Sequence, residues 1–292
     1  MERSSSGTAT GEPARPAGRP PTRLIVQADD YGACRAVSDG VLRCFRAGAV
    51  TQASVIVPAG DAPRATAAAL AAGLPLGAHL ALLCEWEGLR WAPLTAAPSL
   101  RAADGGFHDD LGVLRARGVA AEAEEELRAQ VRAVTEAGVR LTHTESHVQV
   151  YDTELLARLS AEWGLPSRDP VPAPGLCLGL DSLWHLSVQE LRHKTEALLD
   201  HVRSLGPGTH MVVAHPAEDH PELLTLCSPD SRRWKWARDI RVSDTEALLD
   251  PRFLELCAAR GVELMALPPT GAAITAQAVR GPAQARSRRA TS

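Results

Sequence analysis

Short apolar or β-branched runs bounded by turn residues recur along the chain and predict buried strands. Six such runs cover residues 24–28, 52–57, 76–81, 141–146, 211–214 and 262–267. A weaker seventh lies near residues 165–169, where the chain leaves a predicted helix at Trp163 and Gly164. These runs are too short to be helices of ordinary length, so we expect about seven strands.

Apolar residues recur at helical spacing between these runs. One such segment ends before Gly48, and a second covers residues 121–138, with an acidic start and Gly138 past its end, as suits the helix dipole and a glycine cap. An alanine-rich helix is expected from residue 65, before the strand at 76–81. Further helices are predicted at residues 153–163, 187–205 and 251–260.

Strands that alternate with helices predict a parallel sheet. Roughly 250 residues with about seven repeats favour an α/β fold of the deformed (β/α) barrel type, with about seven parallel strands. An open doubly wound sheet is the alternative. No G-x-G-x-x-G or G-x-x-x-x-G-K-[ST] loop follows a predicted strand, so a nucleotide phosphate site has no support.

The two ends of the chain differ in composition from the middle. Residues 1–22 are rich in Pro, Gly, Ser and Thr and have no apolar segment of a secretory signal, and residues 270–292 carry four arginines, no acid and few bulky apolar side chains. We expect both segments to be disordered tails and residues 23–269 to form a single domain.

Charge and cysteine content indicate which classes of partner and which cellular compartment the chain suits. Lys and Arg number 31 against 35 Asp and Glu, so no basic field attracts nucleic acid. Residues 65–84 carry no formal charge but are interrupted by Gly73, Pro75 and Gly77, which argues against a membrane span. Six cysteines without a C-x-x-C pair favour a reducing, cytoplasmic setting.

Ionisable residues stand where several predicted strands end, which is where β/α barrels place catalytic groups. Asp29 and Asp30 close the first strand, and these carboxylates suit a metal ligand and a general base; alternatively, such an Asp caps the next helix. His79 ends another strand and suits a divalent cation, or is a satisfied core histidine. His215 follows the run 211–214 and suits a general acid or base, or is a turn residue.

The segment LTHTESHVQV gives the strongest local signal. His143, Glu145 and His147 share one parity and therefore point to one face of a strand. Three ionisable groups on one buried face need partners or a metal. The alternative is a solvated edge strand.

Trp86 and Trp91 occur in CEWEGLRWAPL, directly after the strand that carries His79. A tryptophan face over the barrel rim suits stacking on a sugar ring. Packing in the core is the competing interpretation.

Five motifs in order resemble the YdjC-like family of ChbG-type carbohydrate deacetylases, from residue 24 to about residue 267. ADDYG is similar to the family's ADDFG, GAVTQASVIV to GIVTSTSLMV, and GAHL to GxHL. THTESH is similar to THLDSH, and AHPA to CHPA. Glu145 stands where Asp is usual in the family, and Val148 and Gln149 replace a histidine-rich continuation.

The resemblance implies a fold, a reaction and roles for individual residues. It implies a polysaccharide-deacetylase-like barrel, often a homodimer, in which Asp30, His79 and His147 hold a divalent metal, usually Mg²⁺ with Zn²⁺ as the alternative. Asp29 is then the general base and His215 the general acid. His143, Glu145, Trp86 and Trp91 are left to the substrate or to the support of the metal ligands.

The function expected from the sequence is the metal-dependent removal of an N-acetyl group from a small-molecule acetylated amino sugar, with release of acetate. One alternative is a catalytically altered sugar-binding barrel, which the departures at residues 145–149 favour and the presence of Asp29 and His215 opposes. The other is a metal-dependent sugar isomerase or epimerase, a class whose sites carry more carboxylate ligands.

Overall fold

The computed structural model describes residues 20–148, 153–168, 177–180, 191–231 and 236–269. Of the predicted tails, residues 1–19 and 270–292 lie outside these ranges, as does Gln149. The first strand already begins at Thr22, one residue before the predicted start of the domain. No helix in the described ranges is long and apolar enough to cross a membrane.

Seven parallel strands form one sheet within the described residues, in agreement with the predicted class. Their order is β4-β3-β2-β1-β6-β5, and β7 pairs with β1. The bounds are β1 Thr22–Tyr31, β2 Gln52–Val55, β3 Leu76–Leu80, β4 Thr144–Ser146, β5 Cys177–Gly179, β6 Gly208–Ala214 and β7 Glu263–Leu264.

β1 is the central strand of a curled half-barrel. It pairs with β6 over residues 22–28, with β2 over residues 27–31 and with β7 at Arg23 and Leu24. β4 and β5 stand at the two ends of the sheet and do not pair with each other in the described part of the chain. The sheet is therefore open on that side rather than fully closed.

The six main predicted strands are present, with altered lengths. The weaker run at 165–169 contributes an isolated parallel bridge between Thr144 and Ser167, and residue 169 lies outside the described ranges. β5 was not predicted: it is three residues long and none of its side chains is fully buried, so it has no apolar run to recognise.

Helices follow most strands. Those foreseen from the sequence are α1 Arg35–Arg46, α2 Ala62–Ala72, α4 Ala120–Glu136, α5 Thr153–Trp163, α6 Leu191–Ser204 and α8 Pro251–Ala259. Not foreseen are α3 Leu111–Arg117, α7 Ala237–Leu249 and the short 3-10 helices η1 Pro98–Leu100 and η4 Pro221–Leu226.

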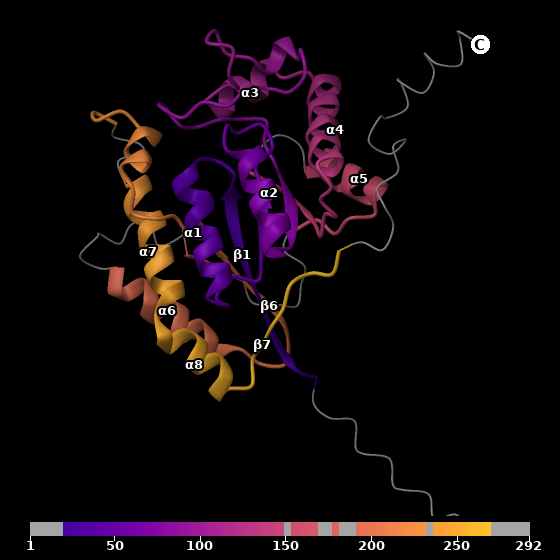
Figure 1. Ribbon diagram of the computed structural model, residues 1–292. Coiled ribbons are helices and arrows are strands. Elements are labelled where there is room, and N and C mark those ends of the chain that lie inside the picture. Colours follow the sequence, from indigo (N-terminus) through magenta and orange to yellow (C-terminus); the bar gives the residue numbers. More distant parts are fainter. Residues whose placement is uncertain (1–19, 149–152, 169–176, 181–190, 232–235, 270–292) are drawn as a thin grey trace, which may run out of the picture.

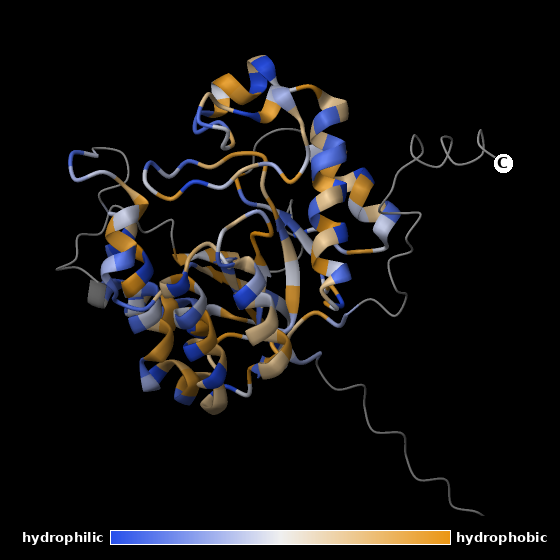
Figure 2. Cartoon of the chain, turned by 45° about the horizontal axis from the view of Figure 1, so that its top comes forward, coloured by the Kyte–Doolittle hydropathy of each residue, from blue (hydrophilic) through white to orange (hydrophobic). Residues whose placement is uncertain are grey.

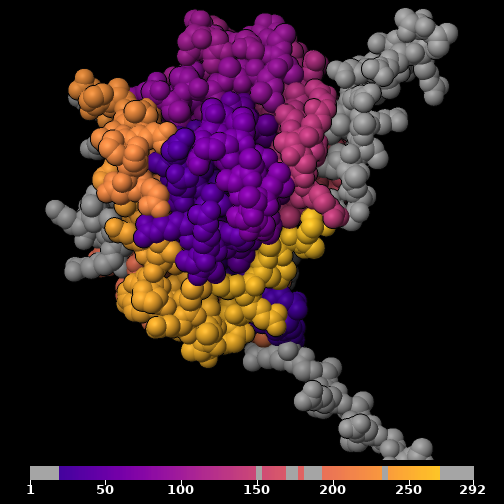
Figure 3. Space-filling view, in the orientation of Figure 1, coloured from indigo at the N-terminus to yellow at the C-terminus, as the bar shows by residue number. Residues whose placement is uncertain are grey.

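The helices surround the sheet on its outer side. α1 and α2 lie in front of β1 in Figure 1, α4 and α5 stand to one side, and α6, α7 and α8 pack together at the other. The same division is visible on the surface in Figure 3. In Figure 2 these helices carry both hydrophilic and hydrophobic bands, as amphipathic helices over an apolar core do.

Candidate metal centre and active site

The carboxyl ends of the parallel strands bring the predicted polar residues to one edge of the sheet. Asp29 and Asp30 lie late in β1, His79 late in β3 and Glu145 in β4. His147 comes directly after β4, and His215 directly after β6. All strands run in the same direction, so these ends face the same space, as the sequence predicted.

An irregularity in β1 lets adjacent carboxylates serve one site. Side chains alternate between the faces of a regular strand, which would separate Asp29 from Asp30. The register with β2 shifts between Ala28 and Tyr31, and Asp30 has a φ of 62°, in the left-handed region. Asp is one of the few residues that tolerate this conformation, and bulges of this kind often re-aim a side chain beside an active site. As a result, both carboxylates lie against His79.

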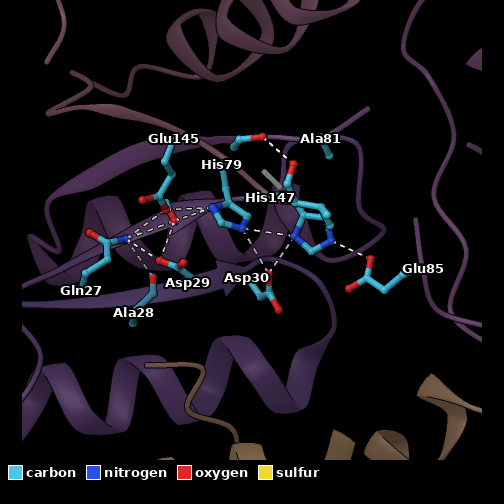
Figure 4. A network of polar contacts seen from close by, with 12 residues as sticks. Gln27, Ala28, Asp29, Asp30, His79, Ala81, Glu85, Glu145 and His147 are labelled. Atoms are coloured by element: carbon cyan, nitrogen blue, oxygen red, sulfur yellow. Dashed lines mark hydrogen bonds and ion pairs between the residues drawn. The ribbon is translucent and has the colours of Figure 1, made fainter. Parts of the chain in front are cut away.

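Three donor atoms converge at the end of the sheet (Figure 4). Asp30 Oδ1 lies 3.2 Å from His79 Nε2 and 3.1 Å from His147 Nδ1, and these two nitrogens are 3.2 Å apart. Two ligands each about 2.1 Å from an ion are about 3.0 Å apart at a right angle and about 3.4 Å apart at a tetrahedral angle. The spacing therefore fits a shared divalent cation.

The hydrogen bonding and charge of the site also fit a cation. Asp30 Oδ1 is buried and, when the inner nitrogens of His79 and His147 carry no proton, accepts no hydrogen bond from the described residues. Four carboxylates stand close together there, those of Asp29, Asp30, Glu85 and Glu145, against two guanidinium groups. Buried charge is costly unless it is balanced. With neutral histidines, a divalent cation balances this set.

The outer nitrogen of each candidate ligand histidine is held by a carboxylate. His79 Nδ1 lies 2.8 Å from Glu145 Oε1, and His147 Nε2 lies 2.8 Å from Glu85 Oε2 (Figure 4). Such partners fix the ring orientation and the tautomer that leaves the inner nitrogen free to bind metal. Glu145 was among the predicted residues, whereas no local pattern singles out Glu85.

The same contacts shift the pKa values of these groups when no cation is bound. Burial lowers the pKa of His79, but Asp30 and Glu145 outweigh it and raise this pKa to about 9. Burial likewise opposes Glu85 and Asp30 at His147, whose pKa rises to about 10. The pKa of Asp30 is held well below its usual range, against the effect of burial, by His147, His79 and Arg241.

Asp29 is fixed by a guanidinium group that the sequence analysis missed. Arg168 Nη1 donates to Asp29 Oδ1 at 2.9 Å and to Oδ2 at 2.8 Å, and Arg168 Nε contacts Glu145 Oε2 at 2.6 Å. Gln27 Nε2 donates to Asp29 Oδ1 at 3.1 Å. Burial raises the pKa of Asp29 to about 6, against the opposing charge of Arg168.

His215 directly follows β6, the strand that pairs with β1 on the side opposite β2. Ala28 pairs with Ala214, so Asp29 and His215 are the next residues along two paired strands. The Nδ1 of His215 is buried and makes no hydrogen bond with the described part of the chain. Its main-chain N–H donates to Asp244 Oδ2 at 2.6 Å. The predicted base and acid are therefore neighbours.

A family comparison covers most of the folded region. The model of the family described as YdjC-like protein matches residues 23–259. The chain belongs to the YdjC-like family. The match reaches from the start of β1 into α8 and includes every residue of the site described above.

Individual relatives agree with this membership. A protein of Danio rerio named carbohydrate deacetylase is 33% identical over 54% of this chain, a match that spans 52% of the relative's own length. A chitooligosaccharide deacetylase of Yersinia pestis is 28% identical over 82% of this chain and 96% of its own. A crystal structure from Enterococcus faecalis, of a candidate cellobiose-phosphate cleavage protein, has the same fold, with a TM-score of 0.66 at 22% identity, over 84% of this chain and 97% of its own.

In this YdjC-like chain His143 lies beside Glu145 and is not one of the three converging donors. Its ring is buried against Gly77 of β3, where an added Cβ would come within 2.4 Å of the ring. Thr142 Oγ1 lies 2.8 Å from Nδ1, and Nε2 is 3.8 Å from Glu145 Oε2. A position facing Glu145 suits support of that carboxylate.

Trp86 and Trp91 line the wall of the site, each only 3% exposed. Trp91 sets its ring edge-on to His147, with centroids 5.4 Å apart, and donates its indole N–H to Leu83 O. The guanidinium carbon of Arg241 lies 4.8 Å from the centre of the Trp86 ring. This burial agrees with the packing interpretation, and neither ring offers a broad free face for a sugar.

Arg241 is another site residue that the sequence analysis missed. Its guanidinium group contacts Asp30 Oδ2, so the carboxylate presents its other oxygen, Oδ1, to the two histidines. Glu85, Arg168 and Arg241 are charged residues outside the strands, where charge ordinarily indicates a solvated surface. No local pattern in the sequence marks them as buried.

Proposed function

We propose that this chain is a metal-dependent carbohydrate deacetylase that removes the acetyl group from an N-acetylated amino sugar and releases acetate. The observation that carries the proposal is the convergence of Asp30, His79 and His147 beside a buried Asp29 and a neighbouring His215. The names of the relatives from Danio rerio and Yersinia pestis support the same substrate class.

Asp30, His79 and His147 would hold the cation. A divalent ion held there would supply polarisation of the acetamide carbonyl and a lowered pKa for water. Mg²⁺ is the ion that the sequence resemblance implies, and Zn²⁺ is the alternative that two imidazole donors favour. Glu145 and Glu85 keep the inner nitrogens of both histidines in place for it.

Asp29 is the general base of the proposed reaction. Arg168 contacts both of its carboxylate oxygens and therefore fixes the direction from which the carboxylate can take a proton from water. Burial raises the pKa of Asp29 to about 6. This pKa is closer to neutral pH than that of an exposed carboxylate, as suits a general base.

His215 is the general acid. It follows Ala214, which pairs with the residue before Asp29, and Nδ1 makes no hydrogen bond with the described residues, so the ring is not committed to a structural contact at that atom. Protonation of the departing amine by a well-placed acid contributes on the order of 10²–10⁴-fold to the rate. The products are acetate and a free amino sugar.

Localisation and assembly belong to the proposal as well. Cys34, Cys44, Cys84, Cys227 and Cys257 form no disulfide within the described residues, which suits a reducing cytoplasm. A homodimer is the assembly that the sequence resemblance implies, with a small-molecule sugar and no nucleic acid or membrane as partner.

The test is acetate release by the purified protein from a panel of N-acetylated amino sugars and chitooligosaccharides. We expect release by the wild type, and a loss of at least about 10²-fold in Asp29→Asn and in His215→Ala at unchanged metal content. His220→Ala is the matched control, because His220 is exposed and its ring accepts the main-chain N–H of Glu222 at the start of η4. Sugar interconversion without acetate would instead indicate an isomerase, and sugar binding without turnover a binding barrel.

A further inference from the structure

Helix α7 turns a polar face toward the site. Asp244 and Thr245 lie three and four residues after Arg241, which places them on the same face of the helix, and all three are buried. Arg241 contacts Asp30, as described above. Thr245 Oγ1 donates to Ala217 O at 2.8 Å, and Asp244 Oδ2 accepts the main-chain N–H of His215 at 2.6 Å. One helix thus contacts both a candidate metal ligand and the segment that carries the candidate acid.

Asp244 is itself held by a buried cation. Lys194 of α6 forms an ion pair with Asp244 Oδ1, and the two residues are 2% and 0% exposed. The Lys194 ammonium also donates to Ile240 O at 3.1 Å and to Ser243 Oγ at 3.0 Å. Desolvation of such a pair is costly, and apolar side chains of similar size often join two helices at least as stably. Packing of α6 on α7 alone does not account for this pair.

The hydrogen bond that the His215 N–H donates to Asp244 lies at a sensitive point of the chain. β6 pairs with β1 up to Ala214, so His215 is the first residue beyond the ladder, and Pro216 after it has no N–H to donate. The N–H of His215 is therefore the last main-chain donor before the turn. Its hydrogen bond to Asp244 orients the main chain at this residue. A misplacement of about 1 Å in a catalytic group can reduce the rate on the order of 10²-fold.

We propose that Asp244, backed by Lys194, is a positioning residue that sets the main chain of His215 for protonation of the leaving amine. The inference rests on the proposed function and adds to it two buried residues, whose polar contacts given above are to the main chain of His215 and within α6 and α7. A purely structural pair would affect the stability of the fold and leave the chemistry of a correctly folded molecule unchanged.

The test compares two double variants in which the buried charge pair is removed together. Asp244→Asn with Lys194→Met is uncharged and keeps an oxygen that can accept the His215 N–H. Asp244→Ala with Lys194→Met is also uncharged but has no acceptor. We expect the Asn double variant to recover at least about a third of the wild-type kcat and the Ala double variant to lose at least about tenfold in kcat, with KM and metal content within about twofold.

A second substrate separates positioning of the acid from general damage. The phenolate of an aryl acetate leaves without protonation, so the two double variants should cleave such an ester at similar rates and differ only on acetamides. Equal rates of the two double variants on the acetamide would overturn the inference, and so would an equal loss on both substrates in the Ala double variant.

Amide hydrogen exchange at His215, measured by NMR, gives a readout that needs no turnover. Protection should be retained in the Asn double variant and lost in the Ala double variant. If the wild type released no acetate from any sugar or ester, the proposed function would fail; the exchange data would still report whether Asp244 fixes this segment. Protection that persists in the Ala double variant would overturn the positioning role.

Discussion

Glu85 and Glu145 show how much of the site depends on residues that would not touch the metal. Each carboxylate forms a hydrogen bond with the outer nitrogen of one histidine, and each is buried. Glu145 also contacts Arg168, which in turn holds Asp29. A change at either carboxylate is therefore expected to reach the metal ligands through the imidazole ring.

Glu85→Gln tests this dependence. Gln keeps the size of the side chain but loses the charge that favours an inner nitrogen free for metal, so we expect metal affinity to fall by about 10–100-fold. The measurement is titration with Zn²⁺ or Mg²⁺ against a competing chelator. Glu87→Gln is the control, because Glu87 lies two residues away in the same loop and binds Ser228 and Ser231. Equal affinity of the two variants would show that Glu85 does not orient His147.

The sequence predicted the residues at the strand ends and missed those that support them. Asp29, Asp30, His79 and His215 each follow an apolar run, so their position in the fold is visible in the local pattern. Arg168 and Arg241 approach the site from segments 139 and 211 residues away from their carboxylate partners. No local spacing encodes such contacts, because only the tertiary fold brings these segments together.

Helix α7 was missed for a related reason. A helix is recognised by an apolar stripe facing the core, but the buried positions of α7 include Arg241, Ser243, Asp244 and Thr245. The polar inward face that serves the site removes the periodic signal. The strands around β1, by contrast, are buried along nearly their whole length and were predicted within a few residues.

Helix α1 is packed so closely on the turn after β6 that one glycine controls the fit. An added Cβ at Gly40 would come within 2.4 Å of Ala217 Cα and 2.5 Å of Ala217 C, main-chain atoms that cannot rotate away. We expect Gly40→Ala to lower the free energy of unfolding by about 1–3 kcal/mol, as overpacking does, and to lower kcat by displacing the segment that carries His215.

Urea unfolding and acetate release measure the two effects of Gly40→Ala. Gly206→Ala is the control, because nothing lies within 4 Å of the added Cβ there and the backbone has no positive φ. The control should leave stability unchanged or raise it by up to about 1 kcal/mol. A Gly40→Ala protein with wild-type stability and kcat would contradict the close approach of α1 to this turn.

For the molecule as a whole, the candidate metal ligands join segments that are distant in the sequence. Asp30 is in β1, His79 in β3 and His147 after β4, so a cation bound to all three would link strands across one half of the sheet. The unfolded chain does not present these donors together, so a cation stabilises the folded state by mass action.

Thermal unfolding should therefore depend on the concentration of metal. At 100 times the dissociation constant the stabilisation is about 2.7 kcal/mol, which corresponds to a rise in Tm of roughly 5–11 °C for a domain of this size. Differential scanning calorimetry of the wild type and of His147→Ala, with and without metal, measures it. His147→Ala should show little metal-dependent rise, whereas an equal rise in both proteins would place the cation elsewhere.

Chelation followed by reconstitution tests the central claim most directly. Acetate release from an N-acetylated amino sugar is measured before chelator, after removal of metal, and after separate addition of Mg²⁺, Zn²⁺, Mn²⁺ and Co²⁺. The account predicts that release falls below about one hundredth of the starting rate without metal and returns with at least one of the four ions, but not in His79→Ala. Release that continues at the full rate in the metal-free protein would contradict a metal-dependent deacetylase built on Asp30, His79 and His147.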